Sequence, residues 1–379
     1  MQPIKILITG GGTGGHVFPA IAIADAIRSI RPDAEFLFVG AEGKMEMERV
    51  PKAGYAIEGL KIAGFQRQMT VSNALKNLTV PYKVLSSLLK ARRIIRRFRP
   101  NVVVGTGGYA SGPVMRAAQQ MGVPTVIQEQ NSYAGVTNKI LGKRAAAVCV
   151  AYDNMEKFFP VGKMVFTGNP VRSDILKLDG KRPEAMVHYG LDPAKKTIAV
   201  IGGSLGARTF NETLRDNKAL LIAHPGVQVL WQCGKFYEME FAESETANLP
   251  QVYMTAFIDR MDLLYTAADV IISRAGALSI SELCLVGKPV VLVPSPNVAE
   301  DHQTKNAISL VEQGAARLVR DADAYEKMLD EALLILNNDA LGFSLGESIR
   351  QLGRPNAAGA IANEVIKHLK TTDKKKRGA

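Results

Sequence analysis

The sequence has few cysteines and no long apolar segment. Its three cysteines, Cys149, Cys233 and Cys284, lie in or beside apolar runs and show no metal-binding spacing. This pattern favours a reduced compartment, in which a buried thiol acts as a small apolar side chain. No stretch reaches the roughly eighteen apolar residues that a membrane-spanning helix needs, so none is expected. The N-terminus lacks the charged head, apolar middle and small-residue cleavage site of a secretory signal.

Two kinds of ligand-binding pattern are also missing. No cluster of histidine, cysteine and carboxylate residues has metal-ligand spacing, so neither a metal nor another cofactor is expected. The D-x-D sequence Asp321-Ala322-Asp323 stands near a predicted helix start and far from any glycine turn, which favours a capping role. The G-x-x-x-x-G-K-[S/T] motif of ATPases is absent, so phosphate is not expected to be bound in that way.

Acidic residues are missing from one long segment. The formal net charge of +11 favours an anionic partner: nucleic acid, an acidic membrane or a phosphorylated substrate. Residues 69–100 contain no acidic residue, and basic residues alternate there with apolar ones. The second half has helical apolar spacing and is expected to be mostly core, with its basic residues on the solvated face. The first half could dock onto anionic lipid. The residues expected in this membrane patch are Leu75, Lys76, Leu78, Tyr82 and Lys83. No nucleic-acid-binding module is visible, so no nucleic acid is expected.

A short apolar run that ends in a glycine turn occurs twice. Residues 4–9 run into the glycine-rich turn 10–15, and residues 197–201 run into the turn 202–207. Such a turn can bind phosphate, because glycine lets backbone N–H groups approach the anion and the following helix start adds partial positive charge. Two such units suggest two doubly wound domains that face one cleft and bind a diphosphate-containing ligand.

The predicted strands form two series, and within each series helical segments separate the strands. The first series is 4–9, 35–39, 102–105, 125–128, 147–150 and 165–167, and the second is 198–201, 227–231, 252–255, 270–273 and 290–293. Helices are expected at 19–29, 85–98 and 354–370. Strands that alternate with helices predict an α/β fold with parallel sheets covered on both faces.

His16 directly follows the first glycine turn, at the sheet edge where α/β proteins bind ligands. A neutral imidazole there could take a proton from an attacking hydroxyl. Alternatively, His16 could simply cap the helix start. The glycines at 10, 12 and 15 also match the G-x-G-x-x-G pattern of nicotinamide dehydrogenases, with Glu42 as a loose candidate for the ribose carboxylate. A dehydrogenase would not need an imidazole at this turn, which favours the base.

Three further segments could contribute to the same kind of site. The turn 105–109 could hold a second phosphorylated ligand or be a plain tight turn. In the segment 274–282, helix-start amides could hold phosphate oxygens, and Glu282 could accept hydrogen bonds from a vicinal diol such as ribose. Glu282 could equally be a surface carboxylate near a helix start. Gln303 could read sugar hydroxyls or be a solvated helix residue.

In this order and spacing, the motifs resemble those of the MurG family. These enzymes are the UDP-N-acetylglucosamine–N-acetylmuramyl-(pentapeptide) pyrophosphoryl-undecaprenol N-acetylglucosamine transferases. The resemblance runs from Ile6 to about Ala316 and is carried by 11–16, 105–109, 129–131, 168–172, 202–204 and 276–278 with Glu282.

The resemblance implies a GT-B fold, with two Rossmann-like doubly wound domains and an interdomain cleft. The first domain, 1–168, would face acceptor and membrane, and the second, 169–350, would bind the UDP-sugar. A closing helix at 351–370 would return to the first domain, and a basic tail at 371–379 would be disordered. The implied reaction is inverting transfer of N-acetylglucosamine from UDP-N-acetylglucosamine to the 4-hydroxyl of the muramoyl sugar of undecaprenyl-linked lipid I, which makes lipid II.

The resemblance also implies roles for single residues. His16 is the candidate base, the backbone at Ile258 would read uracil, and Glu282 would hold the ribose hydroxyls. The other expected donor-binding residues are Thr13, Gly14, Gly15, Asn131, Arg172, Ser204, Ala277, Leu278, Ser279 and Gln303. Candidates on the acceptor side are Gly12, Gly107, Gly108 and Tyr109.

A lipid-borne acceptor implies a peripheral membrane protein on the cytoplasmic face of the bacterial cell membrane. Three positions depart from the family pattern, since Gln128, Leu205 and His302 stand where His, Gln and Gln are common. Three alternatives stay open: another GT-B transferase acting on a different glycolipid, a UDP-sugar 2-epimerase, and a non-enzymatic basic module that binds nucleic acid or membrane.

Overall fold

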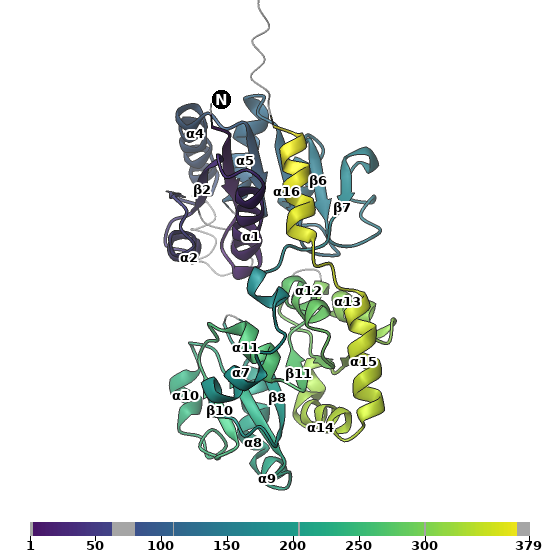
Figure 1. Ribbon diagram of the computed structural model, residues 1–379. Helices are drawn as coiled ribbons and strands as arrows, with labels where there is room; N and C mark the ends of the chain where they lie inside the picture. Colours follow the sequence, from purple (N-terminus) through teal and green to yellow (C-terminus); the bar gives the residue numbers. More distant parts are fainter. Residues whose placement is uncertain (1–2, 63–79, 109, 204, 299–300, 370–379) are drawn as a thin grey trace, which may run out of the picture. The chain divides into compact units, whose positions relative to one another are not determined.

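The computed structural model describes residues 3–62, 80–108, 110–203, 205–298 and 301–369, with backbone alone at 80–83 and 173. The chain divides into two compact units (Figure 1). Unit 1 comprises Met1–Val171 and Asn356–Ala379, and unit 2 comprises Arg172–Pro355. The predicted tail at 371–379 lies outside the described residues.

Unit 1 contains a seven-stranded sheet in the order β3-β2-β1-β4-β5-β6-β7. Every neighbouring pair of strands in it is parallel. The strands are β1 (Lys5–Thr9), β2 (Glu35–Ala41), β3 (Ile57–Leu60), β4 (Val102–Gly105), β5 (Thr125–Glu129), β6 (Ala147–Val150) and β7 (Met164–Phe166). Because the strands are parallel, their carboxyl ends meet at one edge of the sheet.

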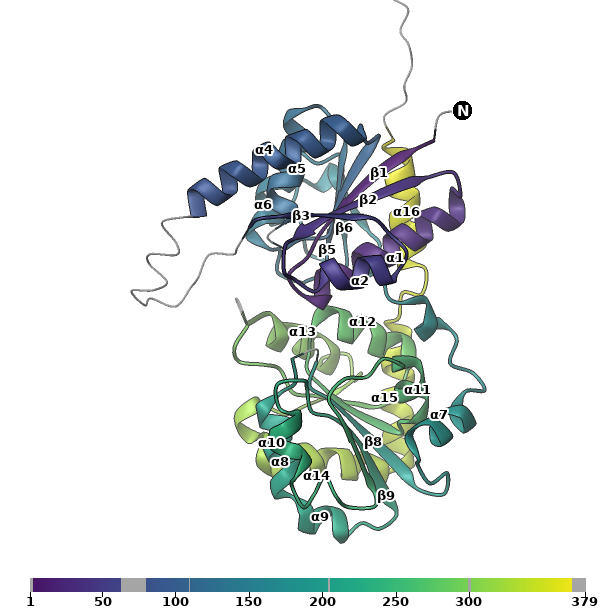
Figure 2. The same ribbon diagram turned by 90° about the vertical axis from the view of Figure 1, so that its left-hand side faces the viewer.

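Helices cover both faces of this sheet. They are α1 (Gly14–Ile30), α2 (Glu46–Lys52), α4 (Val80–Phe98), α5 (Ser111–Gln120), α6 (Val136–Gly142), α16 (Ala357–Lys367) and the short 3₁₀ helix η1 (Val161–Lys163). Helices α1 and α16 lie side by side, as do α4 and α5 (Figures 1 and 2). Ile6 and Ile8 of β1 pack with α1 and α16, whereas Leu7 packs with α4 and α5. The alternation of side chains along a strand therefore gives the unit two apolar layers, one on each face of the sheet.

Unit 2 contains a six-stranded parallel sheet in the order β10-β9-β8-β11-β12-β13. Its strands are β8 (Lys196–Ile201), β9 (Val227–Gln232), β10 (Val252–Thr255), β11 (Val270–Ser273), β12 (Val290–Leu292) and β13 (Arg317–Leu318). Its helices are η2 (Ser173–Leu176), α7 (Arg182–Tyr189), α8 (Arg208–Asp216), α9 (Lys218–Ile222), α10 (Glu238–Ala242), α11 (Met261–Ala267), α12 (Ala277–Val286), α13 (His302–Val311), η4 (Asp321–Asp323), α14 (Ala324–Leu336) and α15 (Asp339–Gln351). Two buried apolar clusters again form its core.

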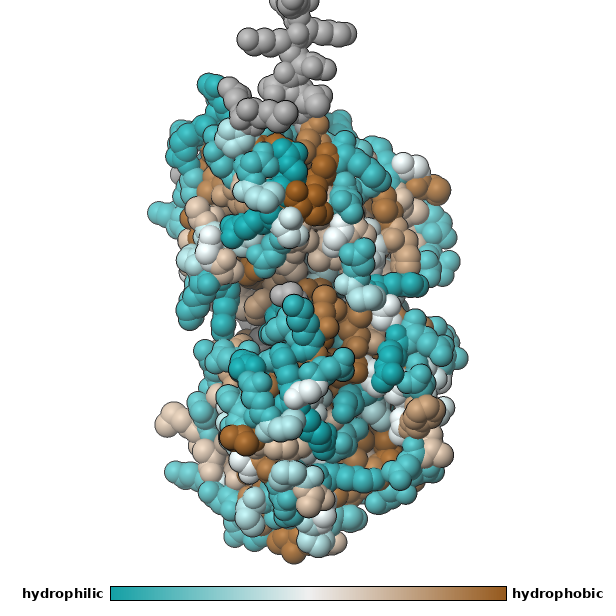
Figure 3. Space-filling model, in the orientation of Figure 1, coloured by the Kyte–Doolittle hydropathy of each residue, from teal (hydrophilic) through white to brown (hydrophobic). Residues whose placement is uncertain are grey.

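The surface of the molecule is predominantly polar where it can be seen. The face in Figure 3 is mainly hydrophilic, with separate smaller hydrophobic areas. Within the described ranges, no helix combines the length and the apolar character needed to cross a bilayer.

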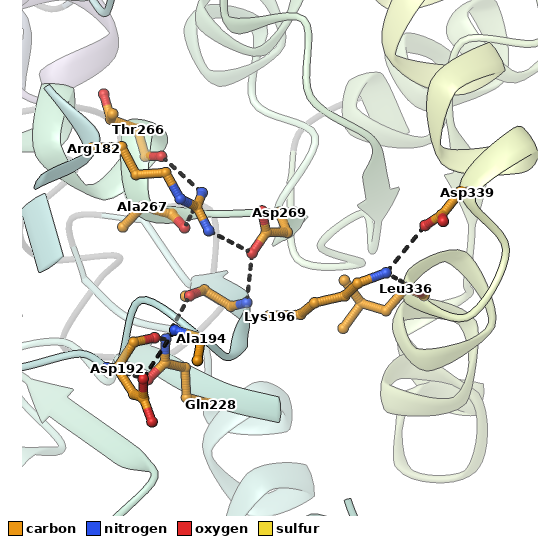
Figure 4. Close-up of polar contacts among 11 residues, drawn as sticks. Arg182, Asp192, Ala194, Lys196, Gln228, Thr266, Ala267, Asp269, Leu336 and Asp339 are labelled. Atoms are coloured by element: carbon orange, nitrogen blue, oxygen red, sulfur yellow. Dashed lines mark hydrogen bonds and ion pairs between the residues drawn. The ribbon is translucent and has the colours of Figure 1, made fainter. Parts of the chain in front are cut away.

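A polar network connects α7, α11, β8 and α15 of unit 2 near the amino ends of β8 and β11 (Figure 4). The carboxylate of Asp269 accepts hydrogen bonds from the Arg182 side chain at 3.1 Å and from the backbone N–H of Thr197 at 2.8 Å. Arg182 also donates to the carbonyl of Ala267 at 3.1 Å. Nearby, Lys196 Nζ lies 3.1 Å from the carboxylate of Asp339.

We expect replacement of Asp269 by alanine to lower the free energy of unfolding by about 1–3 kcal/mol, because it leaves a strand amide and a guanidinium without their charged acceptor. Asp339→Ala is the matched control, since that side chain is 95% exposed and its ion pair should contribute less than about 1 kcal/mol. Urea unfolding of both variants measures the difference. Equal loss in the two variants would contradict this account of the network.

Candidate functional site

The carboxyl edge of the unit 1 sheet brings together loops that are far apart in the sequence. The turn after β1 is joined to the turn after β4 by the N–H of Gly11, which donates to the carbonyl of Gly107 at 3.3 Å. The loop after β5 reaches the same edge, since Gln130 donates to the carbonyl of Thr106 at 2.7 Å. The order β1-β4-β5 within the sheet explains this juxtaposition.

His16 stands in the first turn of α1 and is held by Thr106 at two points. The ring nitrogen Nδ1 lies 2.8 Å from the Thr106 carbonyl oxygen, and the Thr106 hydroxyl donates to the His16 carbonyl at 2.8 Å. A carbonyl can only accept, so the neutral ring must carry its proton on Nδ1 and keep its lone pair on Nε2. A Cβ at Gly107 would lie 2.9 Å from this ring, so glycine there makes room for the imidazole.

Burial lowers the pKa of His16 below that of a free histidine. The carboxylate of Glu129, the bond to Thr106, the side chain of Gln130 and the carboxylate of Glu46 oppose this shift without cancelling it. The imidazole is therefore neutral near pH 7 and can act as a proton acceptor.

A buried carboxylate that was not predicted braces the glycine turn. Glu46 on α2 accepts hydrogen bonds from the N–H of Gly12 at 3.0 Å and from the N–H of Ala41 at 2.9 Å. A Cβ on Gly11 would lie 2.1 Å from its Oε1. Glycine at position 11 thus makes room for a carboxylate of the protein, and the Gly12 amide already has a negative partner.

The other unit 1 residues expected in the site lie along the same turns. Thr13 is the N-cap of α1, which begins with Gly14 and Gly15. Gly108 has a φ of +82°, and a Cβ there would lie 2.0 Å from the Gly11 carbonyl oxygen, so only glycine fits. Tyr109 lies outside the described residues.

Glu129 holds the loop that carries Asn131. One of its carboxylate oxygens accepts from the Asn131 N–H at 3.1 Å, and the other accepts from Gly135 at 3.0 Å and Asn138 at 2.9 Å. Glu129 is fully buried, so these hydrogen bonds satisfy its charge. The position of Asn131 therefore depends on Glu129.

In unit 2, α12 starts directly at the carboxyl end of β11, with Gly276 as its N-cap. The first-turn amides of an α-helix have no partner within the helix and carry the positive end of its dipole. In α12 these are the amides of Ala277, Leu278 and Ser279. These are the helix-start amides that the sequence predicts for a phosphate site.

Glu282 lies one turn further along α12, within a partly buried polar cluster. Tyr265 donates to Glu282 Oε2 at 2.9 Å, and Arg172 Nε lies 3.5 Å from Oε1. Burial raises the pKa of Glu282, and the Arg172 guanidinium and the Tyr265 hydroxyl oppose this rise. Glu282 is thus a partly buried carboxylate, with 14% of its side chain exposed, that is held by two neighbours rather than a fully solvated surface group.

Two neighbouring loops complete this edge of unit 2. Gln232, at the end of β9, donates to the carbonyl of Gly203 at 2.9 Å and to that of Ala256 at 3.3 Å. It therefore connects the glycine turn after β8 with the loop after β10. Ile258 lies in that loop with its side chain in the core, so its backbone is the part available for polar contacts. Ser204 lies outside the described residues.

Gln303 and the D-x-D sequence have partners within the protein. Gln303 Oε1 accepts from the N–H of Ser295 at 2.8 Å, which anchors the loop after β12. Asp321 lies 2.5 Å from Arg274, and Asp323 pairs with Arg320 at 2.8 Å. Over the part of the chain that the structure describes, no group of three or more His, Cys, Asp and Glu side chains could hold a metal ion.

The predicted membrane patch lies outside the described residues, apart from the backbone of two of its members. Leu75, Lys76 and Leu78 lie outside the described residues, and so do the side chains of Tyr82 and Lys83 on α4. The described part of α4 exposes three large apolar side chains near its start, Val84, Leu85 and Leu89.

Comparison with known proteins gives concordant matches over nearly the whole chain. The model of the glycosyltransferase family 28 N-terminal domain matches residues 6–150, and that of the family 28 C-terminal domain matches residues 197–351. Proteins of *Bacteroides fragilis* and *Bacteroides thetaiotaomicron*, both named UDP-N-acetylglucosamine–N-acetylmuramyl-(pentapeptide) pyrophosphoryl-undecaprenol N-acetylglucosamine transferase, are each 55% identical to this chain. The alignments cover 96% and 97% of this chain and 95% and 98% of those proteins. The crystal structure of *Acinetobacter baumannii* MurG, 30% identical, covers 96% of this chain and 100% of its own, with a TM-score of 0.74.

Proposed function

This chain belongs to glycosyltransferase family 28, and from that premise we propose that it transfers N-acetylglucosamine from UDP-N-acetylglucosamine to lipid I. The product is lipid II, the disaccharide precursor of peptidoglycan. The observation that carries this proposal is the 55% identity, over 96% of the chain, with a transferase named for this reaction. The two parallel α/β sheets belong to the GT-B fold.

His16 is the base in the proposed reaction. Its Nε2 takes the proton from the 4-hydroxyl of the muramoyl sugar, whose oxygen forms a bond to C1 of N-acetylglucosamine. The bond between C1 and the diphosphate oxygen breaks at the same time, and UDP leaves with its electron pair. One in-line displacement inverts the anomeric centre and needs one base and one stabilised leaving group. The neutral, Nδ1-protonated ring of His16 supports this role.

The nucleotide is proposed to bind at the carboxyl edge of the unit 2 sheet. Helix-start amides of Ala277, Leu278 and Ser279, with Ser204, would hold the diphosphate, so the leaving group needs no metal. Glu282, braced by Tyr265, would accept hydrogen bonds from the ribose hydroxyls.

The remaining proposed contacts with the substrates are made by residues in the loops at the carboxyl edges of the two sheets. The backbone of Ile258 would pair with uracil, and Arg172 would contact the nucleotide. Gln303 and Asn131 would contact the sugar of the donor. The turn Thr13-Gly14-Gly15 of unit 1 would close on the donor. The acceptor would contact Gly12, Gly107, Gly108 and Tyr109.

We also propose that the enzyme works as a peripheral protein at the cytoplasmic face of the bacterial membrane, where its lipid-linked acceptor would be found. The exposed apolar residues Val84, Leu85 and Leu89 in the first half of α4 support this, because they lie within the segment 69–100, which contains basic residues and no acidic ones. Anionic lipid would attract the basic residues, and the apolar side chains would enter the interface.

Release of UDP from UDP-N-acetylglucosamine, with and without a lipid I analogue in vesicles, tests the proposal. We expect release only when the analogue is present, with faster turnover in vesicles that contain phosphatidylglycerol than in neutral vesicles. Conversion of UDP-N-acetylglucosamine to its C2 epimer without any acceptor would favour a 2-epimerase, and use of a different glycolipid in place of lipid I would favour another GT-B transferase. No release under any of these conditions would refute the proposed function.

A further inference from the structure

Three residues with buried amide side chains, Gln128, Gln130 and Asn169, form a closed circuit of hydrogen bonds. The circuit is connected to His16 through the Thr106 carbonyl, which accepts from both Gln130 and His16. Asn169 Nδ2 donates to the main-chain carbonyl of Gln130 at 3.0 Å, and Asn169 Oδ1 accepts from Gln128 Nε2 at 2.9 Å. Gln128 Oε1 in turn accepts from Gln130 Nε2. All three residues are buried.

Main-chain carbonyls fix the orientation of every amide in this circuit. The carbonyl of Gln130 can only accept, so the nitrogen of Asn169 must face it and the oxygen of Asn169 must face Gln128. Because Gln128 Nε2 donates to Asn169, the side-chain oxygen of Gln128 must face Gln130. The nitrogen of Gln130 then donates to a second carbonyl, that of Thr106, at 2.7 Å.

The carbonyl of Thr106 thus has two donors, Gln130 Nε2 and His16 Nδ1. These two bonds use both of its lone pairs. If the imidazole proton were on Nε2 instead, the Nδ1 lone pair would face the carbonyl oxygen at 2.8 Å and repel it. The choice of tautomer therefore depends on where this carbonyl is held.

We propose that Gln130, oriented by Gln128 and Asn169, is a positioning residue that holds the Thr106 carbonyl and so keeps the proton of neutral His16 on Nδ1. This inference rests on the proposed role of His16 as the base. Nε2 is the nitrogen that must be free when the acceptor hydroxyl arrives, and a base in the wrong tautomer cannot take the proton. The circuit also gives Gln128, which departs from the family pattern, a specific task.

The test replaces Gln130 with methionine, which keeps the side-chain length and removes the amide. We expect kcat to fall about ten- to hundredfold, because the base loses its orientation, while KM for UDP-N-acetylglucosamine stays within about twofold. Gln119→Met is the matched control. It also removes a unit 1 amide that donates to a carbonyl, that of Leu141 at 2.9 Å, but it is not part of the circuit.

Long-range ¹H–¹⁵N spectra of protein with labelled histidines give a second readout, independent of turnover. The chain has five histidines, and comparison with His16→Ala assigns the His16 signals. We expect a single tautomer with the proton on Nδ1 in the wild type and a mixture in Gln130→Met. Gln128→Met, one step further along the circuit, should change the spectrum in the same direction and provides a second variant.

A wild-type ring with its proton on Nε2 would overturn the inference, whatever the variants do. So would a Gln130→Met enzyme with wild-type kcat and an unchanged tautomer. The two proposals fail in different ways. If His16→Ala keeps full turnover, the base is wrong, whereas an inactive His16→Ala beside a fully active Gln130→Met refutes only the positioning role.

Discussion

Replacing His16 with alanine should lower turnover of the lipid I analogue by at least about a hundredfold, because general base catalysis contributes that much or more. The affinity for UDP should change little, since the nucleotide is proposed to bind at the unit 2 edge. Steady-state UDP release gives kcat, and calorimetric titration with UDP gives the affinity.

The pH dependence of the wild-type enzyme provides an independent check. A base works only when deprotonated, and burial lowers the pKa of His16. The acid limb of kcat/KM should therefore lie below about pH 6.5, the usual pKa of histidine. His188→Ala, at an exposed position in unit 2, should leave both turnover and this limb unchanged. An acid limb that persists in His16→Ala would assign it to another group.

Replacing Glu282 with glutamine should raise KM for UDP-N-acetylglucosamine about ten- to hundredfold. The carboxylate is partly buried, accepts from Tyr265 at 2.9 Å and lies 3.5 Å from Arg172. An amide supplies only one accepting atom and no negative charge to face the Arg172 cation. Hydrogen bonds to a charged group contribute about 1.5–3 kcal/mol, which corresponds to this range of affinity. Calorimetric titration with UDP measures the loss directly.

The Tyr265→Phe variant distinguishes the effect of the charge on Glu282 from the effect of the hydrogen bond that Tyr265 donates to it. This variant keeps the carboxylate and removes one neutral donor, so we expect UDP affinity to fall by only about threefold to tenfold. The ratio of affinities for UDP and 2′-deoxy-UDP should decrease in Glu282→Gln, because the lost acceptor is the one proposed to read the ribose. A Glu282→Gln enzyme with wild-type UDP affinity would remove this residue from the nucleotide site.

The two parallel α/β sheets were predictable, because their strands are apolar runs separated by helical segments, and this prediction is confirmed. Strands β3 and β13 were missed. The four residues of β3 include Glu58 and Gly59, and β13 has only two residues, so neither forms a recognisable apolar run. The start of α1 was also placed wrongly. It was predicted at residue 19, yet the helix begins at Gly14 within the glycine turn, although glycine has a low helix propensity.

The candidate base could be selected from sequence because a single histidine follows a long glycine turn. The residues that support His16 could not be identified in this way. Thr106, Gln130 and Glu46 reach His16 and its turn only because the sheet order places β4 beside β1 and β5 beside β4, and α2 beside β2. Thr106 and Gln130 lie in two of the segments that carry the family resemblance, but the sequence does not show that they contact His16, and Glu46 is an unremarkable residue of a short helix. The glycine at position 11 was interpreted as space for phosphate, and it proves to accommodate the carboxylate of Glu46.

Helix α16 has a consequence for how the chain is made. It belongs to unit 1, where its residues Ile361, Ala362 and Val365 share a buried cluster with Val17 and Ile23 of α1. All of unit 2 is translated between α1 and α16. On the ribosome, the part of α1 that packs against α16 thus stays uncovered until α16 emerges, so unit 1 is completed only after the whole of unit 2 has been synthesised.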